Sequence, residues 1–212
     1  MNGLEPHGFL PADVKGVLGV QYRALGVLFD PLRILWSDPS YMGSIYDGVS
    51  KFVSMIEDEE LSCPMEKLVL VGYSQGALAL HIALRVIAAA DPAELSPTHI
   101  GAVLMVADLA KVGNALKETW QGDQAVAGAG VLNAKGIWTT TPGLPDQGPL
   151  PASVVGSTLA ICHNHDIVCA PGSGSNVDNH TNHTGTEMDD MGLWAANLML
   201  ANYGTAFSLT GL

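Results

Sequence analysis

The pentapeptide Gly72–Gly76, GYSQG, contains residues that can carry out nucleophilic chemistry. It follows an apolar run of strand length, Lys67–Gly72, and opens an alanine- and leucine-rich helix predicted over Ser74–Ala90. A serine in such a strand-to-helix elbow lies in a strained turn at the carboxyl edge of a sheet, where glycines avoid clashes. We therefore predict Ser74 as a nucleophile and the backbone N–H of Gln75 as an oxyanion-hole donor. The alternative is a tight turn in which Ser74 only caps the helix.

A serine nucleophile needs a base, and an acidic residue that orients the base. Asp166 follows an apolar run that ends near Cys162, so we expect it at the same edge of the sheet. Two histidines, His180 and His183, come later, ahead of the last predicted helix. The chain order serine, aspartate, histidine fits a catalytic triad built on this elbow. Asp166 as a solvated loop carboxylate remains the alternative, and both histidines remain candidates for the base.

The cysteines form no recognisable metal motif. The chain has three of them, Cys63, Cys162 and Cys169, and no CxxC pair. A histidine of the neighbouring loop, His163 or His165, could complete a zinc site, but without a CxxC pair we predict that the chain binds no metal. We expect both histidines to be exposed loop residues. If the chain is oxidised, an odd number of cysteines leaves one thiol without an intramolecular partner.

Apolar periodicity predicts the elements that position these side chains. We expect strands at Val17–Tyr22, Lys67–Gly72, His99–Val106 and Val154–Cys162, and helices at Ser44–Leu61, Ser74–Ala90 and Met188–Tyr203. This alternation predicts an α/β fold, a three-layer α/β/α sandwich around a central, mostly parallel sheet. The weakly patterned segment 109–151 is rich in Gly, Ala and Pro, which indicates a loop over the site. His81, within the second helix, is expected to be buried or half-buried.

Length, charge and hydropathy indicate the number of domains and exclude some classes of function. The chain has 212 residues, which fits a single domain over residues 1–212. The formal net charge of -12 argues against nucleic acid as a partner, because few basic residues are present to neutralise phosphates. Hydrophobic residues make up 48% of the chain, enough for a core, but no apolar run has the length of a membrane span. We expect a monomer without an integral membrane segment.

These motifs resemble the cutinase family of α/β-hydrolases, which also includes small acetylxylan esterases. The segment from Cys63-Pro64 through GYSQGA is similar to the family's segment before and through the elbow. The pattern Cys-x3-Asp-x2-Cys at Cys162, Asp166 and Cys169 is similar to the family's aspartate loop. The resemblance extends from about Cys63 to Tyr203, and more loosely back to Val17, and it implies a lidless α/β-hydrolase fold.

The resemblance also implies roles for individual residues. Ser74 would be the nucleophile, Asp166 would orient the base, and a histidine a dozen or so residues later would be the base. The family often shows His-x-x-Tyr at this place, and His180-Thr181-Asn182-His183 matches it with His183 in the tyrosine position, which favours His180. A disulfide between Cys162 and Cys169 would bracket the aspartate and would indicate a secreted protein.

The implied activity is hydrolysis of carboxylic esters, such as cutin-like, acyl or lipid esters, without a cofactor. One alternative is a mycolyl-ester hydrolase of the phage lysin B type, whose elbow also reads GYSQGA. Those enzymes usually lack cysteines around the aspartate, so Cys162 and Cys169 favour the cutinase side. A second alternative is a catalytically silent remnant or binding protein with the same fold.

The start of the chain departs from the family pattern. The family normally opens with a strand that ends in an Arg-Gly-Ser/Thr-x-Glu loop, which supplies a second oxyanion-hole donor. The same segment normally contains the cysteine that pairs with Cys63. This chain begins at Met1-Asn2-Gly3-Leu4-Glu5-Pro6, without that strand. Our hypothesis is that the sequence starts inside its open reading frame, and that an upstream extension encodes the strand, the loop and one cysteine.

Overall fold

The computed structural model describes residues 17–25, 39–90, 99–113, 119–121, 134–145 and 148–203. The helices are α2 (Pro39–Ser62), α3 (Gln75–Ala90), α6 (Ile137–Thr140), α7 (Ala152–Val155), α8 (Asp178–Thr181) and α9 (Gly185–Tyr203). The strands are β1 (Leu68–Tyr73), β2 (Ile100–Val106), β3 (Thr119–Gln121) and β4 (Thr158–Ile161).

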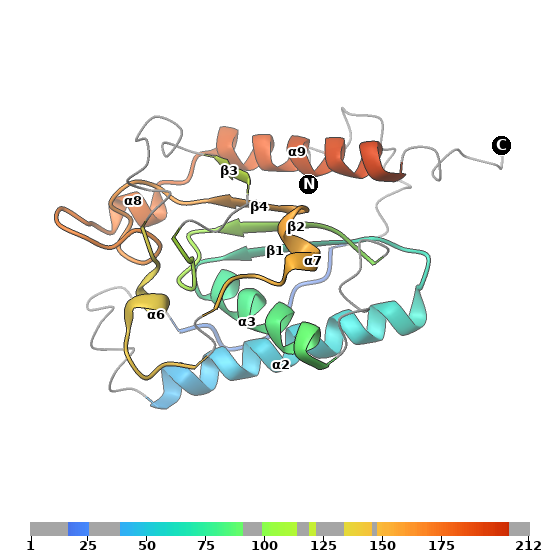
Figure 1. Ribbon diagram of the computed structural model, residues 1–212, viewed down its shortest axis with the longest axis horizontal. Coiled ribbons are helices and arrows are strands. Elements are labelled where there is room, and N and C mark those ends of the chain that lie inside the picture. Colours follow the sequence, from blue (N-terminus) through green and yellow to red (C-terminus); the bar gives the residue numbers. More distant parts are fainter. Residues whose placement is uncertain are drawn as a thin grey trace.

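The described strands form one parallel sheet in the order β1-β2-β4-β3. Helices α2 and α3 cover one face of this sheet and α9 covers the other, so the fold has three layers (Figure 1). The α/β prediction is confirmed. Strand β3 lies inside segment 109–151, where the sequence predicted only a loop, because three residues are too few for a periodic pattern.

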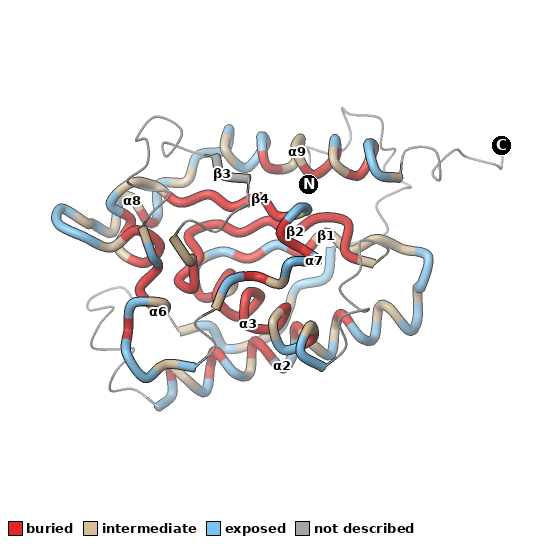
Figure 2. Tube along the Cα trace, in the orientation of Figure 1, coloured by how far each residue is buried: buried red, intermediate tan, exposed pale blue. Residues whose placement is uncertain are grey.

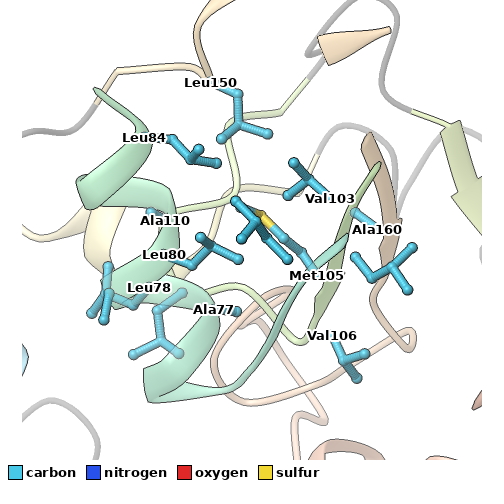
Figure 3. Packing of buried hydrophobic residues seen from close by; sticks show 14 of the residues in the cluster. Ala77, Leu78, Leu80, Leu84, Val103, Met105, Val106, Ala110, Leu150 and Ala160 are labelled. Atoms are coloured by element: carbon cyan, nitrogen blue, oxygen red, sulfur yellow. The ribbon is translucent and has the colours of Figure 1, made fainter. Parts of the chain in front are cut away.

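The core lies between the sheet and α3. Every residue of β2 is buried, and α3 is buried along most of its length because it is packed between the sheet and α2. Figure 2 shows the buried residues concentrated along the strands and α3. In Figure 3, Leu80 and Leu84 of α3 lie in one apolar cluster with Val103 and Met105 of β2. The loops that carry the candidate site leave the carboxyl ends of these buried strands.

The predicted strand Val17–Tyr22 is wrong, because this segment has no regular secondary structure. Val17 is 71% exposed, so its side chain does not enter the core. Further along the segment, the Leu25 N–H donates to Gln75 Oε1 at 3.1 Å, and the Arg23 carbonyl accepts a hydrogen bond from Ser44 Oγ. Side chains, rather than a neighbouring strand, therefore satisfy these backbone groups.

The predicted strand Val154–Cys162 is shorter in the structure. Val154 and Val155 belong to the short helix α7, and β4 begins only at Thr158. The two β-branched residues Val154 and Val155 satisfy the sequence criterion for a strand. In the structure both are buried, but they belong to a helical turn that begins after Pro151. Strand β4 ends at Ile161, one residue before the predicted end at Cys162.

None of the helices in the described part of the chain is long and apolar enough to cross a membrane. Residues 1–16, which carry the start of the chain, lie outside the described residues. The hypothesis of an absent first strand therefore remains a prediction.

Candidate active site

Ser74 lies in the elbow between β1 and α3, and its backbone φ is 52°, in the left-handed region that few non-glycine residues adopt. A Cβ on Gly72 would lie 2.7 Å from the Ala77 Cα, so only glycine fits at that position. A Cβ on Gly76 would meet only the Tyr22 hydroxyl, at 3.7 Å, which is an ordinary contact. The described residues therefore require the first glycine of the motif and not the second. Ser74 itself remains partly exposed.

Ser74, His180 and Asp166 form a continuous chain of polar contacts. Ser74 Oγ lies 2.8 Å from His180 Nε2. His180 Nδ1 lies 3.2 Å from Asp166 Oδ1 and 3.1 Å from Oδ2. Because a carboxylate only accepts hydrogen bonds, His180 donates from Nδ1, which leaves Nε2 able to accept the hydroxyl proton of Ser74. Ser74 lies in the elbow after β1, Asp166 in the loop after β4, and His180 in α8.

Asp166 is held inside a short loop closed by a disulfide. Its side chain is completely buried, and Oδ1 accepts the backbone N–H groups of Val168 at 2.7 Å and Cys169 at 3.1 Å. Cys162 and Cys169 form the disulfide on either side of it. The backbone donors compensate the buried negative charge and fix the orientation of the carboxylate.

Tyr73, the last residue of β1, supports His180 from the side. Its hydroxyl donates to the His180 carbonyl at 2.8 Å, and the two rings stack with centroids 5.5 Å apart. Burial and the negative charge of Asp166 raise the pKa of the Tyr73 phenol, so the hydroxyl keeps the proton that it donates. The sequence analysis missed this role, because the strand pattern does not show which loop a strand end faces.

Gln75 contributes differently through its backbone and its side chain. As the first residue of α3, its N–H has no acceptor within the helix and lies next to Ser74. Its side chain is 5% exposed and turns into the protein, where Oε1 accepts from Leu25 N–H at 3.1 Å and Ser44 Oγ at 3.3 Å. The side chain thus connects the elbow to the segment 17–25 and to α2.

His183 does not contact Ser74 or Asp166. Its ring stacks on His163, with centroids 4.2 Å apart, and lies edge-on to Tyr73. Burial and the neighbouring His163 lower the pKa of His183, which favours the neutral ring.

Two expectations for the other loop histidines have different outcomes. His165 is exposed, as predicted. His163 was predicted to be exposed, but its side chain is only 14% exposed, and its Nε2 lies 2.6 Å from Glu187 Oε1 in α9. Burial acts to raise the pKa of Glu187, but hydrogen bonds from His163 and Thr184 lower it overall. The sequence could not place His163, because its partner lies 24 positions further along the chain.

A second buried histidine–aspartate pair follows β2. His81 is buried within α3, as the sequence analysis allowed, and its Nδ1 lies 2.7 Å from Asp108 Oδ2. His81 Nε2 lies 3.1 Å from the Gly148 carbonyl. The residue between β2 and this aspartate is Ala107, with φ of 53°. No nucleophilic side chain contacts this pair among the contacts described.

Comparison with known proteins identifies the family and the fold of the chain. The family profile described as Cutinase matches residues 10–198, whereas no curated protein sequence matches. A solved cutinase-like protein from Cryptococcus sp. is 23% identical, with a TM-score of 0.59 over 73% of this chain and 71% of its own. A solved acetylxylan esterase is 22% identical, with a TM-score of 0.52 over 73% of this chain and 70% of its own. These structures share the fold, and the profile match shows that the chain belongs to the cutinase family of carboxylic ester hydrolases.

Proposed function

We propose that the protein is a serine esterase that hydrolyses carboxylic esters through an acyl-enzyme on Ser74. The observation that carries this proposal is the contact of 2.8 Å between Ser74 Oγ and His180 Nε2, with Asp166 behind the histidine. A nucleophile, a base and an orienting acid in contact constitute the arrangement that activates a serine hydroxyl.

The chemistry follows from the proton positions. His180 Nε2 accepts the Ser74 proton as Oγ attacks the ester carbonyl, and the imidazolium then protonates the leaving alcohol. Water, deprotonated by the same nitrogen, attacks the acyl-enzyme and releases the acid. Asp166 retains its negative charge throughout and stabilises the imidazolium that forms twice in each cycle.

Negative charge develops on the carbonyl oxygen during both attacks. The N–H of Gln75 at the start of α3 is the proposed donor to this oxygen, and the helix N-terminus adds a favourable field. The family resemblance assigns a second donor to a loop after the family's first strand, which is not among the described residues. Loss of one such donor typically costs about 10²–10³ in kcat.

We propose that the substrates are esters of aliphatic acids, including acyl, lipid and cutin-like esters. We also propose that the enzyme is secreted and monomeric. The Cys162–Cys169 disulfide supports an oxidising location. The preformed contacts of Ser74, His180 and Asp166 support an active enzyme over the silent remnant. A mycolyl-ester hydrolase would use the same three residues, so the acyl group must be identified by assay.

The test is hydrolysis of p-nitrophenyl butyrate by the unaltered chain and by Ser74→Ala. Ser74→Ala should lower kcat by about 10⁴–10⁶-fold. The matched control is Ser157→Ala, because Ser157 lies at the opposite end of β4 and its hydroxyl bonds only to the Val154 carbonyl at 3.0 Å. A fluorophosphonate probe followed by peptide mapping should label Ser74 in the unaltered chain and in Ser157→Ala.

Undiminished turnover by Ser74→Ala, or labelling at another residue, would refute the assignment of the nucleophile. Absence of both turnover and labelling in the folded, unaltered chain would support the silent alternative. A series of acetyl, butyryl, longer acyl and mycolyl esters then distinguishes the substrate classes.

A further inference from the structure

Three side chains from separate segments converge beside the loop that carries His180. His163 follows β4, His183 lies between α8 and α9, and Glu187 lies in the first turn of α9. One ligand atom from each lies within 4.8 Å of the others. His163 Nε2 is 2.6 Å from Glu187 Oε1, and His183 Nδ1 is 4.0 Å from Glu187 Oε2. None of the three is needed for the proposed esterase chemistry.

The His183 ring has an unusual environment. Its side chain is only 6% exposed, and neither ring nitrogen has a hydrogen-bond partner within the described part of the protein. Burial of a polar group without a partner costs free energy that a surrounding structure normally compensates. A positive ion held beside Glu187 would give one of these nitrogens the partner that it lacks.

The hydrogen bonds of His163 orient its ring so that Nε2 faces Glu187. Its Nδ1 lies 3.0 Å from the Asn179 carbonyl, which can only accept, so Nδ1 carries a proton. In a neutral ring, the Nε2 lone pair would then face the Glu187 carboxylate, and two acceptors would meet. In the metal-free protein a second proton lies between them, and a bound metal ion would take its place. Metal-bound histidines commonly donate their other ring N–H to a backbone carbonyl in this way.

The geometry points to a binding site for a divalent metal ion of the zinc class on His163, His183 and Glu187, with water as the fourth ligand. Two imidazoles and one carboxylate suit zinc, whereas calcium and magnesium prefer all-oxygen sites. Ligand atoms of a tetrahedral zinc site lie about 3.3 Å apart, given metal–ligand distances of about 2.0 Å. His163 Nε2, at 2.6 Å from Glu187 Oε1, would move by roughly 0.7 Å to reach that spacing, and His183 Nδ1 faces the other oxygen of the same carboxylate, Oε2, at 4.0 Å.

This site differs from the sequence prediction, which considered metals only around the cysteines and expected none. It would connect the loop after β4, the α8–α9 connection and α9. Because His180 precedes His183 by three positions, metal binding would also hold the segment that carries the proposed base. The Glu187 Oε2 atom would keep its second role, in which it accepts the Thr184 N–H at 2.7 Å at the start of α9.

The experiment is titration of the purified, metal-stripped chain with ZnCl₂, followed by thermal unfolding and by elemental analysis. Zinc should bind one ion per chain and raise Tm by about 5–10 °C at a hundredfold excess over Kd. His183→Phe and Glu187→Gln should abolish the shift. Phenylalanine keeps the ring volume without polar atoms, so the metal-free His183→Phe protein should unfold at no lower temperature than the unaltered chain.

Two control variants exclude other sites. His165→Gln removes an exposed histidine of the neighbouring loop, and Cys63→Ser removes the cysteine of a second cluster with Glu59 and Glu66. Both variants should keep the full response to zinc. Cobalt in place of zinc should give the visible absorption of a near-tetrahedral site in the unaltered chain, and this absorption should disappear in His183→Phe. An unaltered chain that shows neither the shift nor the absorption, or a shift that is lost in Cys63→Ser and kept in His183→Phe, would overturn the inference.

Discussion

The residues that follow β1 and β2 have similar backbone dihedral angles but different side-chain chemistry. Ser74 follows β1 with φ of 52°, and Ala107 follows β2 with φ of 53°. A buried histidine–aspartate pair lies at each of these strand ends. At the end of β1 the elbow residue has a hydroxyl in contact with the histidine, and at the end of β2 it has only a methyl group. A comparison of the two regions therefore distinguishes a histidine–aspartate pair that stabilises the fold from one that acts as a base beside a nucleophile.

The difference lies in the group that Nε2 of each histidine contacts. His180 Nε2 faces the Ser74 hydroxyl, which can donate its proton. His81 Nε2 faces the Gly148 carbonyl at 3.1 Å, and His81 Nδ1 faces Asp108, and each of these two groups only accepts hydrogen bonds. His81 must carry two protons to make both bonds, which excludes it as a base. The histidine of a buried histidine–aspartate pair acts as a base only where the group at its other ring nitrogen can donate a proton.

The largest expected difference between the two pairs concerns the rate of ester hydrolysis. Asp166→Asn keeps an oxygen that can accept the Val168 and Cys169 N–H groups, but it no longer fixes the histidine tautomer. We expect kcat for p-nitrophenyl butyrate to fall about 10⁴-fold. Circular dichroism checks that the variant is folded. A loss below tenfold in a folded variant would remove Asp166 from the proposed triad.

The corresponding change in the second pair should lower stability and not activity. Asp108→Asn leaves the buried charge of His81 without its counterion, at a cost of about 3 kcal/mol. We expect Tm to fall by roughly 6–12 °C in thermal unfolding, while kcat below the transition changes by less than about threefold. If Asp108→Asn lowered kcat as strongly as Asp166→Asn, the proposed distinction between the two pairs would be wrong.

The disulfide gives Asp166 a constraint that Asp108 does not have. Replacing Cys162 and Cys169 together by alanine should lower the free energy of unfolding by about 2.5 kcal/mol, because it releases a closed loop of seven-residue separation. Activity should also fall, since the N–H groups that bind the carboxylate belong to this loop. Chemical denaturation and kcat measure the two effects. Cys63→Ala is the control, and an equal loss in that variant would contradict a specific role for the closed loop.

The smallest expected effect concerns Tyr73, for which the second pair has no described counterpart. Tyr73→Phe keeps the ring that stacks on His180 and removes the hydrogen bond to its carbonyl. Loss of a bond worth about 1 kcal/mol should lower kcat about fivefold and leave KM unchanged. Tyr46→Phe, on the exposed side of α2, should leave both constants unchanged. A change in KM alone for Tyr73→Phe would indicate substrate contact rather than positioning of the histidine.

The sequence predicted those parts of the fold that depend on burial along continuous segments. Strand β2 is a continuous apolar run because it is buried throughout, and α3 is rich in Ala and Leu because it is buried on most sides. Strand β1 is equally apolar in sequence, but its residues Val71 and Tyr73 are exposed. Parallel strands bring their carboxyl ends to one edge. Ser74 and Asp166 could therefore be placed near each other from the order of the elements alone.

The remaining features depend on contacts between distant segments, which periodicity does not encode. His180 and His183 differ by less than one helical turn, so spacing could not decide between them. In the structure α8 ends at Thr181, and only His180 faces Ser74. The contact between His163 and Glu187 required the position of α9 relative to the loop after β4. The strand predicted at Val17–Tyr22 failed for a related reason, because its apolar residues contact helices and solvent instead of a sheet.

The left-handed backbone at Ser74 limits how this protein can evolve. Cysteine at this position would keep an unbranched Cβ, so the elbow could accommodate it as it does serine. Threonine adds a methyl group at Cβ, and β-branched residues are genuine outliers at positive φ. A descendant of this protein could therefore acquire a thiol nucleophile by one substitution, whereas the same backbone closes the route to a threonine nucleophile.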